Sequence, residues 1–161
     1  MAIIVEDGTG TSPAANSYVS EAFLETAAAD RGVTLSKAAS ILLTISMDTM
    51  ETRSYQGSKT APTQPLKWPR ANVVIDGSEI PSNSIPLDIQ FAQVAVALSI
   101  NAGNDPSGII KPGVKRKKVD VIEVEYKDGS ANSSFDPKIN ILLKPYLAFQ
   151  GGMSSFSVSR L

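Results

Sequence analysis

The sequence predicts a mainly α-helical fold, a small helical bundle with a β-hairpin and an extended C-terminal tail. Apolar residues recur at helical spacing in four segments bounded by capping residues, glycine or proline. One segment alternates β-branched and charged residues, and the last segment scatters apolar side chains among glycines and serines. We therefore expect one domain over 1–146, helices at about 20–31, 36–53, 86–101 and 137–144, a hairpin at about 114–127, and a tail over 147–161.

The composition excludes several kinds of active site. The chain of 161 residues has no cysteine and no histidine, which removes disulfides, thiolate metal sites and Ser-His or Cys-His nucleophile pairs. We expect no catalytic residue, no metal site, no cofactor and no enzymatic activity. The formal net charge is −1, so binding to nucleic acid would need a local basic patch. No signal peptide or membrane span is expected, which predicts a protein made in the cytoplasm without a membrane partner.

The N-terminal third predicts a short strand and two helices. Ile3, Ile4 and Val5 favour a strand, and the glycine-rich loop at 7–13 lacks the Gly-Lys-Ser/Thr of a phosphate-binding loop. Ser20 and Ser36 are suited to cap the two helices. The residues expected to face the core are Phe23, Leu24 and Ala27 in the first helix, and Ala38, Ile41, Leu42 and Ile45 in the second.

The segment from Gln64 to Arg70, Gln-Pro-Leu-Lys-Trp-Pro-Arg, carries the only tryptophan. Proline before and after Trp68 biases the backbone to extended or turn geometry. A large ring on such a stiff connector is predicted to be a packing anchor in its own domain, and the alternative is a tryptophan exposed for a partner. A short strand at 72–75 and a tight turn at Asp76-Gly77 follow.

The helix expected from Pro86 is the most apolar in the chain. Pro86 suits its first position, and Asp88 places negative charge in the first turn. We expect one face to carry Leu87, Phe91, Val94, Ala95 and Leu98. Apolar residues extend almost all the way round, as in a helix packed on more than one side by its own domain or by a neighbouring subunit.

The predicted hairpin has a basic first arm and an acidic second arm. Lys115, Arg116, Lys117 and Lys118 form the basic cluster. In the second arm Ile122, Val124 and Tyr126 share one face of a strand, and Glu123 and Glu125 point the other way. One interpretation pairs lysines with glutamates across the hairpin. The other places the cluster at an interface with DNA or with a neighbouring subunit.

The tail is too poor in apolar residues to fold alone. It is a candidate for ordering on a partner, and the alternative is a frayed terminus. The residues predicted to dock are Phe149, Met153, Phe156, Val158 and Arg160.

Several motifs, in order along nearly the whole chain, resemble one known family. They are Val5-Glu6-Asp7-Gly8-Thr9-Gly10, Ala15-Asn16-Ser17-Tyr18-Val19-Ser20, Arg53-Ser54-Tyr55-Gln56-Gly57, the Gln64–Arg70 segment, Ile80-Pro81, Ile85-Pro86, Val114-Lys115-Arg116 and Ile122-Glu123-Val124-Glu125-Tyr126. The chain is similar to tailed-phage proteins often labelled DnaT-like single-stranded-DNA-binding proteins. Similar sequences are understood as head-to-tail adaptors of the virion.

The resemblance implies a structural role at the neck of a bacteriophage. About twelve copies would form a ring on the portal protein through head-to-tail contacts between neighbouring adaptor subunits. The implied partners are the portal, the tail or nozzle protein, and packaged double-stranded DNA in the channel. Four charges from each subunit would concentrate roughly 48 positive charges on one circle.

A second function class is a single-stranded-DNA-binding replication protein, as the family label suggests. Such proteins combine a basic groove with aromatic stacking platforms. Aromatic residues make up 6% of this chain, and the basic cluster contains none. An enzyme is a third class, for which the sequence offers no catalytic constellation.

Overall fold

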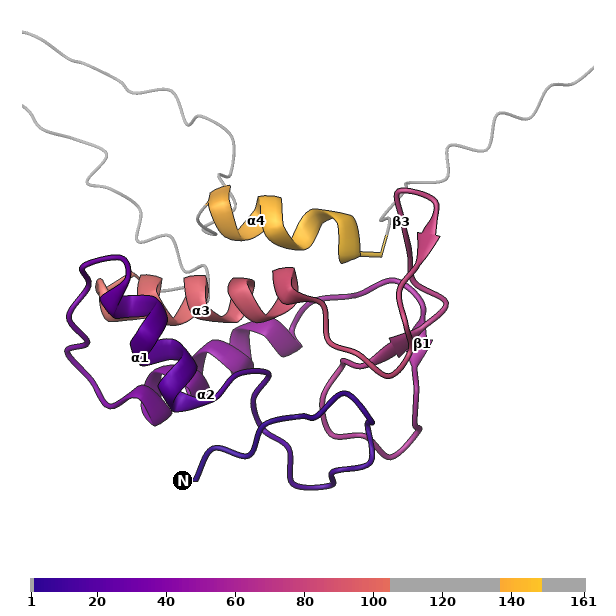
Figure 1. Cartoon of the computed structure of the whole chain (residues 1–161), viewed down its shortest axis with the longest axis horizontal. Coiled ribbons are helices and arrows are strands. Elements are labelled where there is room, and N and C mark those ends of the chain that lie inside the picture. Colours follow the sequence, from indigo (N-terminus) through magenta and orange to yellow (C-terminus); the bar gives the residue numbers. More distant parts are fainter. Residues whose placement is uncertain (1, 105–136, 149–161) are drawn as a thin grey trace, which may run out of the picture.

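Four helices packed together form the body of the protein (Figure 1). The computed structural model describes residues 2–104 and 137–148. Helix α3 (Leu87–Asn101) packs on α2 (Ala39–Glu51) and on α4 (Pro137–Leu143), and α1 (Glu21–Ala29) contacts both α2 and α3. A short 3₁₀ turn, η1 (Lys144–Tyr146), follows α4. The prediction of a mainly α-helical small domain is confirmed, whereas the hairpin predicted at 114–127 lies outside the described residues.

Two small antiparallel hairpins lie between α2 and α3. Strand β1 (Ser58–Lys59) pairs with β2 (Arg70–Ala71), and β3 (Val74–Ile75) pairs with β4 (Ser78–Glu79). The turn of the second hairpin has φ of 49° and 80° at its two central residues, Asp76 and Gly77, as a type I′ turn requires. The turn predicted here is confirmed. The strand predicted at 72–75 is confirmed only at Val74–Ile75, because Asn72 has φ of 59°, outside the extended region. Strands of two residues have no periodicity, so the first hairpin was not predicted.

The predicted N-terminal strand is reduced to a single bridge. Val5 pairs with Ser17 in parallel, outside any named strand. Leu147, placed at the start of the tail, pairs with Tyr55, and the Ala148 N–H donates to the Ser54 carbonyl at 2.9 Å. These two residues therefore pack with the domain.

The two predicted N-caps differ in outcome. The Ser20 hydroxyl accepts the Phe23 N–H at 3.1 Å, which confirms it as the cap of α1. The Ser36 cap was wrong. Its N–H and hydroxyl both bond to Asn101 Oδ1, at 2.7 and 2.9 Å, and α2 begins only at Ala39. A side chain distant in sequence takes up the polar groups that would otherwise cap the helix.

The buried faces of α2 and α3 differ from the predicted ones. Ile41 and Ile45 on α2 are exposed, as is Ala38 before it. Leu87 and Phe91 on α3 are 62% and 38% exposed. Leu42 and Val94, which belong to the predicted faces, are buried. The other large contributions to the core come from Leu43, Met47 and Met50 on α2, and from Ile89, Ala92, Val96, Ala97 and Ile100 on α3. Because these helices are apolar on more than one side, packing decides which side is covered.

Trp68 is fully buried beside the helices. Its ring makes edge contacts with Tyr55 and Tyr146, at centroid distances of 6.0 and 5.8 Å. The peptide bond from Trp68 to Pro69 is cis. The indole packs between two aromatic rings in the relative orientation that aromatic pairs prefer.

The Gln64–Arg70 segment is called the connector below. The side chains at its two ends donate hydrogen bonds to backbone carbonyls of the connector and of the chain before it. The buried Gln64 amide donates to the carbonyls of Leu66 and Pro69, at 2.9 and 3.0 Å. The Arg70 guanidinium donates to four carbonyls, those of Tyr55, Gln56, Gly57 and Lys67. These bonds satisfy backbone carbonyls that no regular secondary structure pairs, whereas the buried indole N–H of Trp68 has no hydrogen-bond partner among the described residues.

Tyr18 links the connector to α2. Its hydroxyl donates to Glu51 Oε1 at 2.6 Å and accepts the Trp68 N–H at 3.3 Å. Burial, with the nearby Glu51 carboxylate, raises the pKa of Tyr18 well above its ordinary value. The hydroxyl therefore keeps its proton and its bond to Glu51 at neutral pH.

Gly57 and Gly32 offer a matched pair of substitutions. Their φ angles are 66° and 65°, but a Cβ on Gly57 would lie 2.1 Å from the Ala71 carbonyl oxygen, whereas one on Gly32 would meet nothing within 4 Å. Each alanine carries a left-handed backbone cost of about 1–2 kcal/mol. We expect Gly57→Ala to lower the free energy of unfolding, measured in urea, by about 1–3 kcal/mol more than Gly32→Ala does, because the β1–β2 pair must move. Equal losses would contradict this packing.

Removing the Tyr18 hydroxyl tests the link to the connector. Tyr18→Phe leaves the Trp68 N–H without its acceptor in a buried site, which is expected to cost about 1–3 kcal/mol of unfolding free energy. The control is Tyr146→Phe. That hydroxyl donates to the exposed Asp88 at 2.9 Å, and losing it is expected to cost about 0.5–1.5 kcal/mol. A smaller loss for Tyr18→Phe than for the control would refute the link.

Candidate functional site

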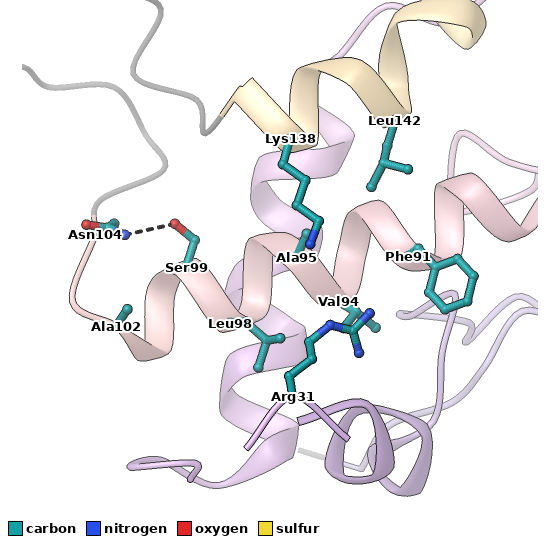
Figure 2. Close-up of a pocket in the computed structure, with 10 residues that line it drawn as sticks. All are labelled: Arg31, Phe91, Val94, Ala95, Leu98, Ser99, Ala102, Asn104, Lys138 and Leu142. Carbon is teal, nitrogen blue, oxygen red and sulfur yellow. Dashed lines mark hydrogen bonds between the residues drawn. The ribbon is translucent and has the colours of Figure 1, made fainter. Parts of the chain in front are cut away.

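A groove of about 430 Å³ lies between α3 and α4 and extends to the end of α1 (Figure 2). Its apolar lining comes mostly from α3, with one residue from α4. The apolar lining residues are Phe91, Val94, Ala95, Leu98, Ala102 and Leu142. Such a volume is typical of sites that hold a ligand or a few side chains of a partner.

The groove exists because α3 has more apolar surface than its neighbours cover. Helix α2 packs on α3, and Ile89 and Val96 of α3 are fully buried. The stripe from Leu87 to Leu98, predicted to share one face of the helix, turns partly outward, and α1 and α4 flank it without closing over it. Phe91 is therefore left 38% exposed at one end of the groove.

A second hollow of about 810 Å³ adjoins the groove along α1. Phe91 and Arg31 line both spaces. Phe23 of α1 lies with its ring centroid 6.0 Å from that of Phe91. Phe91 therefore lies between the two hollows, and Phe23 beside it lines the second one.

Two cationic side chains reach the groove from opposite walls. Figure 2 shows Arg31 extending from the end of α1 and Lys138 from the start of α4, both towards the apolar floor. Arg31 also donates to the Ala27 carbonyl at 2.6 Å. None of the ten lining residues is acidic, and the nearest carboxylate among the lining sets is Asp30 of the second hollow. The groove thus suits an apolar segment that carries carboxylates.

The lining offers no catalytic machinery. The Ser99 hydroxyl accepts from the Asn104 amide at 3.2 Å, and no general base lies among the lining residues. Among residues 2–104 and 137–148, no three acidic side chains gather to hold a metal ion. Within the same residues, no helix has the length and apolar character needed to cross a bilayer.

The glycine-rich loop at 7–13 is occupied by its own chain. Glu6 is buried, and its Oε1 accepts the N–H groups of Gly8 and Gly10, at 3.2 and 2.9 Å. These are the donors that a phosphate would use in an anion-binding loop. The Glu6 carboxylate accepts from these donors instead, so they are not available to a phosphate.

The structure separates the predicted site residues into two groups. Trp68 lies in the core, away from the groove. The basic cluster at 115–118 and the docking residues from Phe149 to Arg160 lie outside the described residues. The groove itself was not predicted. Its one signal in the sequence was the surplus of apolar residues around α3, which indicated packing on more than one side but not which side stays open.

Comparison with known proteins identifies a family and no individual relative. A family model described as "Putative DnaT-like ssDNA binding protein" matches residues 1–161. No curated protein and no solved structure matches the chain. The family match covers the whole sequence, including the described domain and the segments with the basic cluster and the tail. The chain therefore belongs to the family of putative DnaT-like ssDNA-binding proteins.

Proposed function

We propose that this protein is a non-catalytic virion protein, a head-to-tail adaptor that forms a ring on the portal of a tailed phage. The observation that carries the proposal is the apolar surface that the helices leave exposed outside the groove, such as Leu87 of α3, which is 62% exposed. Contiguous exposed apolar surface is typical of sites that bind other proteins. The sequence resemblance to adaptors supplies the kind of assembly, and the family description does not mention it.

Further exposed apolar side chains favour contacts on more than one side. Ile41 and Ile45 on α2 are 51% and 36% exposed, and Ile141 on α4 is 71% exposed. A subunit in a closed ring needs two different contact surfaces, because each copy touches the next head to tail. Apolar residues on separate helices are consistent with such a subunit.

A second candidate function is binding of single-stranded DNA, which the family description favours. The described residues include eight lysines and arginines against ten aspartates and glutamates, a formal charge of −2. A DNA-binding surface needs positive charge and exposed aromatic rings. The phosphate contacts would therefore fall to Lys115, Arg116, Lys117 and Lys118, outside the described part.

The two functions differ in what the free protein does. An adaptor is expected to form rings, seen by electron microscopy, when mixed with portal-bearing heads, and to show no salt-dependent affinity for oligonucleotides. A DNA-binding protein is expected to bind oligothymidine as a monomer, with affinity falling as salt rises at a slope of about −0.7 per phosphate contact. Oligonucleotide binding without rings or head attachment would overturn the adaptor proposal.

Reversing the basic cluster tests its role at an electrostatic interface. Glutamate at all four positions, 115–118, is expected to abolish ring formation or DNA retention in filled heads, because the attraction of the four cations to DNA or to the acidic arm of a neighbour would become repulsion. The control is Lys37→Glu with Lys144→Glu, two exposed lysines of the described domain. Rings and DNA retention that stay at the level of the unaltered protein would rule out this role.

The tail is proposed to dock on the portal. Removing residues 149–161 is expected to abolish attachment to portal-bearing heads and to leave the circular dichroism of the domain unchanged. Serine in place of Phe149, Met153, Phe156 and Val158 should have the same effect, because the apolar anchors are lost. Alanine in place of Ser154, Ser155 and Ser157 is the control. Heads that still bind the truncated protein would contradict this docking.

A further inference from the structure

The segment that leaves α3 and returns to α4 starts and ends at the groove. Asn104, the last described residue after α3, and Lys138, in the first turn of α4, both line the groove. The 32 residues between 104 and 137 are therefore attached at its edge on both sides. Attachment of this kind gives a segment an effective concentration in the millimolar range at a nearby site.

Residues 119–126 are complementary to the groove in charge and share its apolar character. The sequence Val-Asp-Val-Ile-Glu-Val-Glu-Tyr combines apolar side chains with three carboxylates and no cation. The groove has an apolar floor, with Arg31 and Lys138 on opposite walls and no acidic lining residue. An extended segment could place Ile122, Val124 and Tyr126 on the floor and its glutamates at the mouth of the groove.

We propose that residues 119–126 dock in the groove of their own chain, with Glu123 and Glu125 near Arg31 and Lys138. The connections allow it. Fourteen residues lie between 104 and 119, so this connection spans about 50 Å when extended, and ten lie between 126 and 137, which span about 36 Å. The proposal does not depend on the ring, because a monomer would show the docking.

The other nearby segments fit less well. The basic cluster at 115–118 would bring four positive charges to a groove that already has two. The tail carries Arg160 and no acidic side chain, and the described chain ends at Ala148, beside Ser54 and away from the groove lining. Charge complementarity and attachment both favour 119–126.

The cysteine-free chain allows a direct test by cross-linking. The full-length double variant Ser99→Cys with Val124→Cys places one thiol in the groove and one in the proposed occupant, and a short bis-maleimide joins them. The control is Ser82→Cys with Val124→Cys, because Ser82 is exposed in the loop before α3 and does not line the groove. The groove pair is expected to cross-link within the monomer at least about tenfold faster than the control.

Equal rates for the two pairs would overturn the proposal. Cross-links found only in dimers would also overturn it, because the occupant would then come from a second copy. The electrostatic part is tested on the groove pair with Glu123→Lys and Glu125→Lys, which should slow the reaction about tenfold. Asp105→Lys with Asp136→Lys makes the same change in net charge outside the segment, and should leave the rate unchanged. Equal slowing by both variants would exclude a specific contact.

Discussion

The packing of α3 against α2 is the interaction on which the rest of the structure depends. Ile89, Ala92 and Val96 of α3 are completely buried, and burial of large apolar side chains is worth about 1.5–3 kcal/mol each. The same helix also holds the N-terminal segment. Gln93, fully buried, accepts the Tyr18 N–H and donates to Ser17 Oγ, both at 2.9 Å. One helix thus organises the apolar core and the approach of the chain that precedes α1.

The connector that holds Trp68 is stabilised by side-chain hydrogen bonds to its backbone. It has no regular secondary structure at its centre, yet Trp68 and Leu66 are buried. Gln64 and Arg70 donate to backbone carbonyls, and Glu51 accepts the Lys67 N–H at 3.0 Å. Burial and the bond to Asp88 raise the pKa of Tyr146, whose ring packs on the indole, to about 12. The aromatic cluster therefore stays uncharged at neutral pH, which suits a rigid scaffold.

The described domain supports binding of proteins more directly than binding of DNA. Its formal charge is slightly negative, its aromatic rings are mostly buried, and large apolar side chains are exposed on α2, α3 and α4. The segment between α3 and α4 contains the run Lys115-Arg116-Lys117-Lys118, with four adjacent positive charges. Protein contacts and DNA contacts would then belong to different parts of one chain, so the adaptor role and the family description are compatible. A ring would bring the two parts together around a channel.

The sequence by itself determined the fold class, the Ser20 cap, the tight turn at Asp76-Gly77 and the existence of four helices, because caps, turns and apolar spacing act within a few residues. Only the tertiary structure decided which side of α2 and α3 became the core, and that Ser36 bonds to Asn101 instead of capping a helix. Both helices are apolar on more than one side, so local pattern does not distinguish their faces. The groove arises for the same reason: its position depends on how far α1 and α4 extend over α3, and no local preference of the chain specifies that distance.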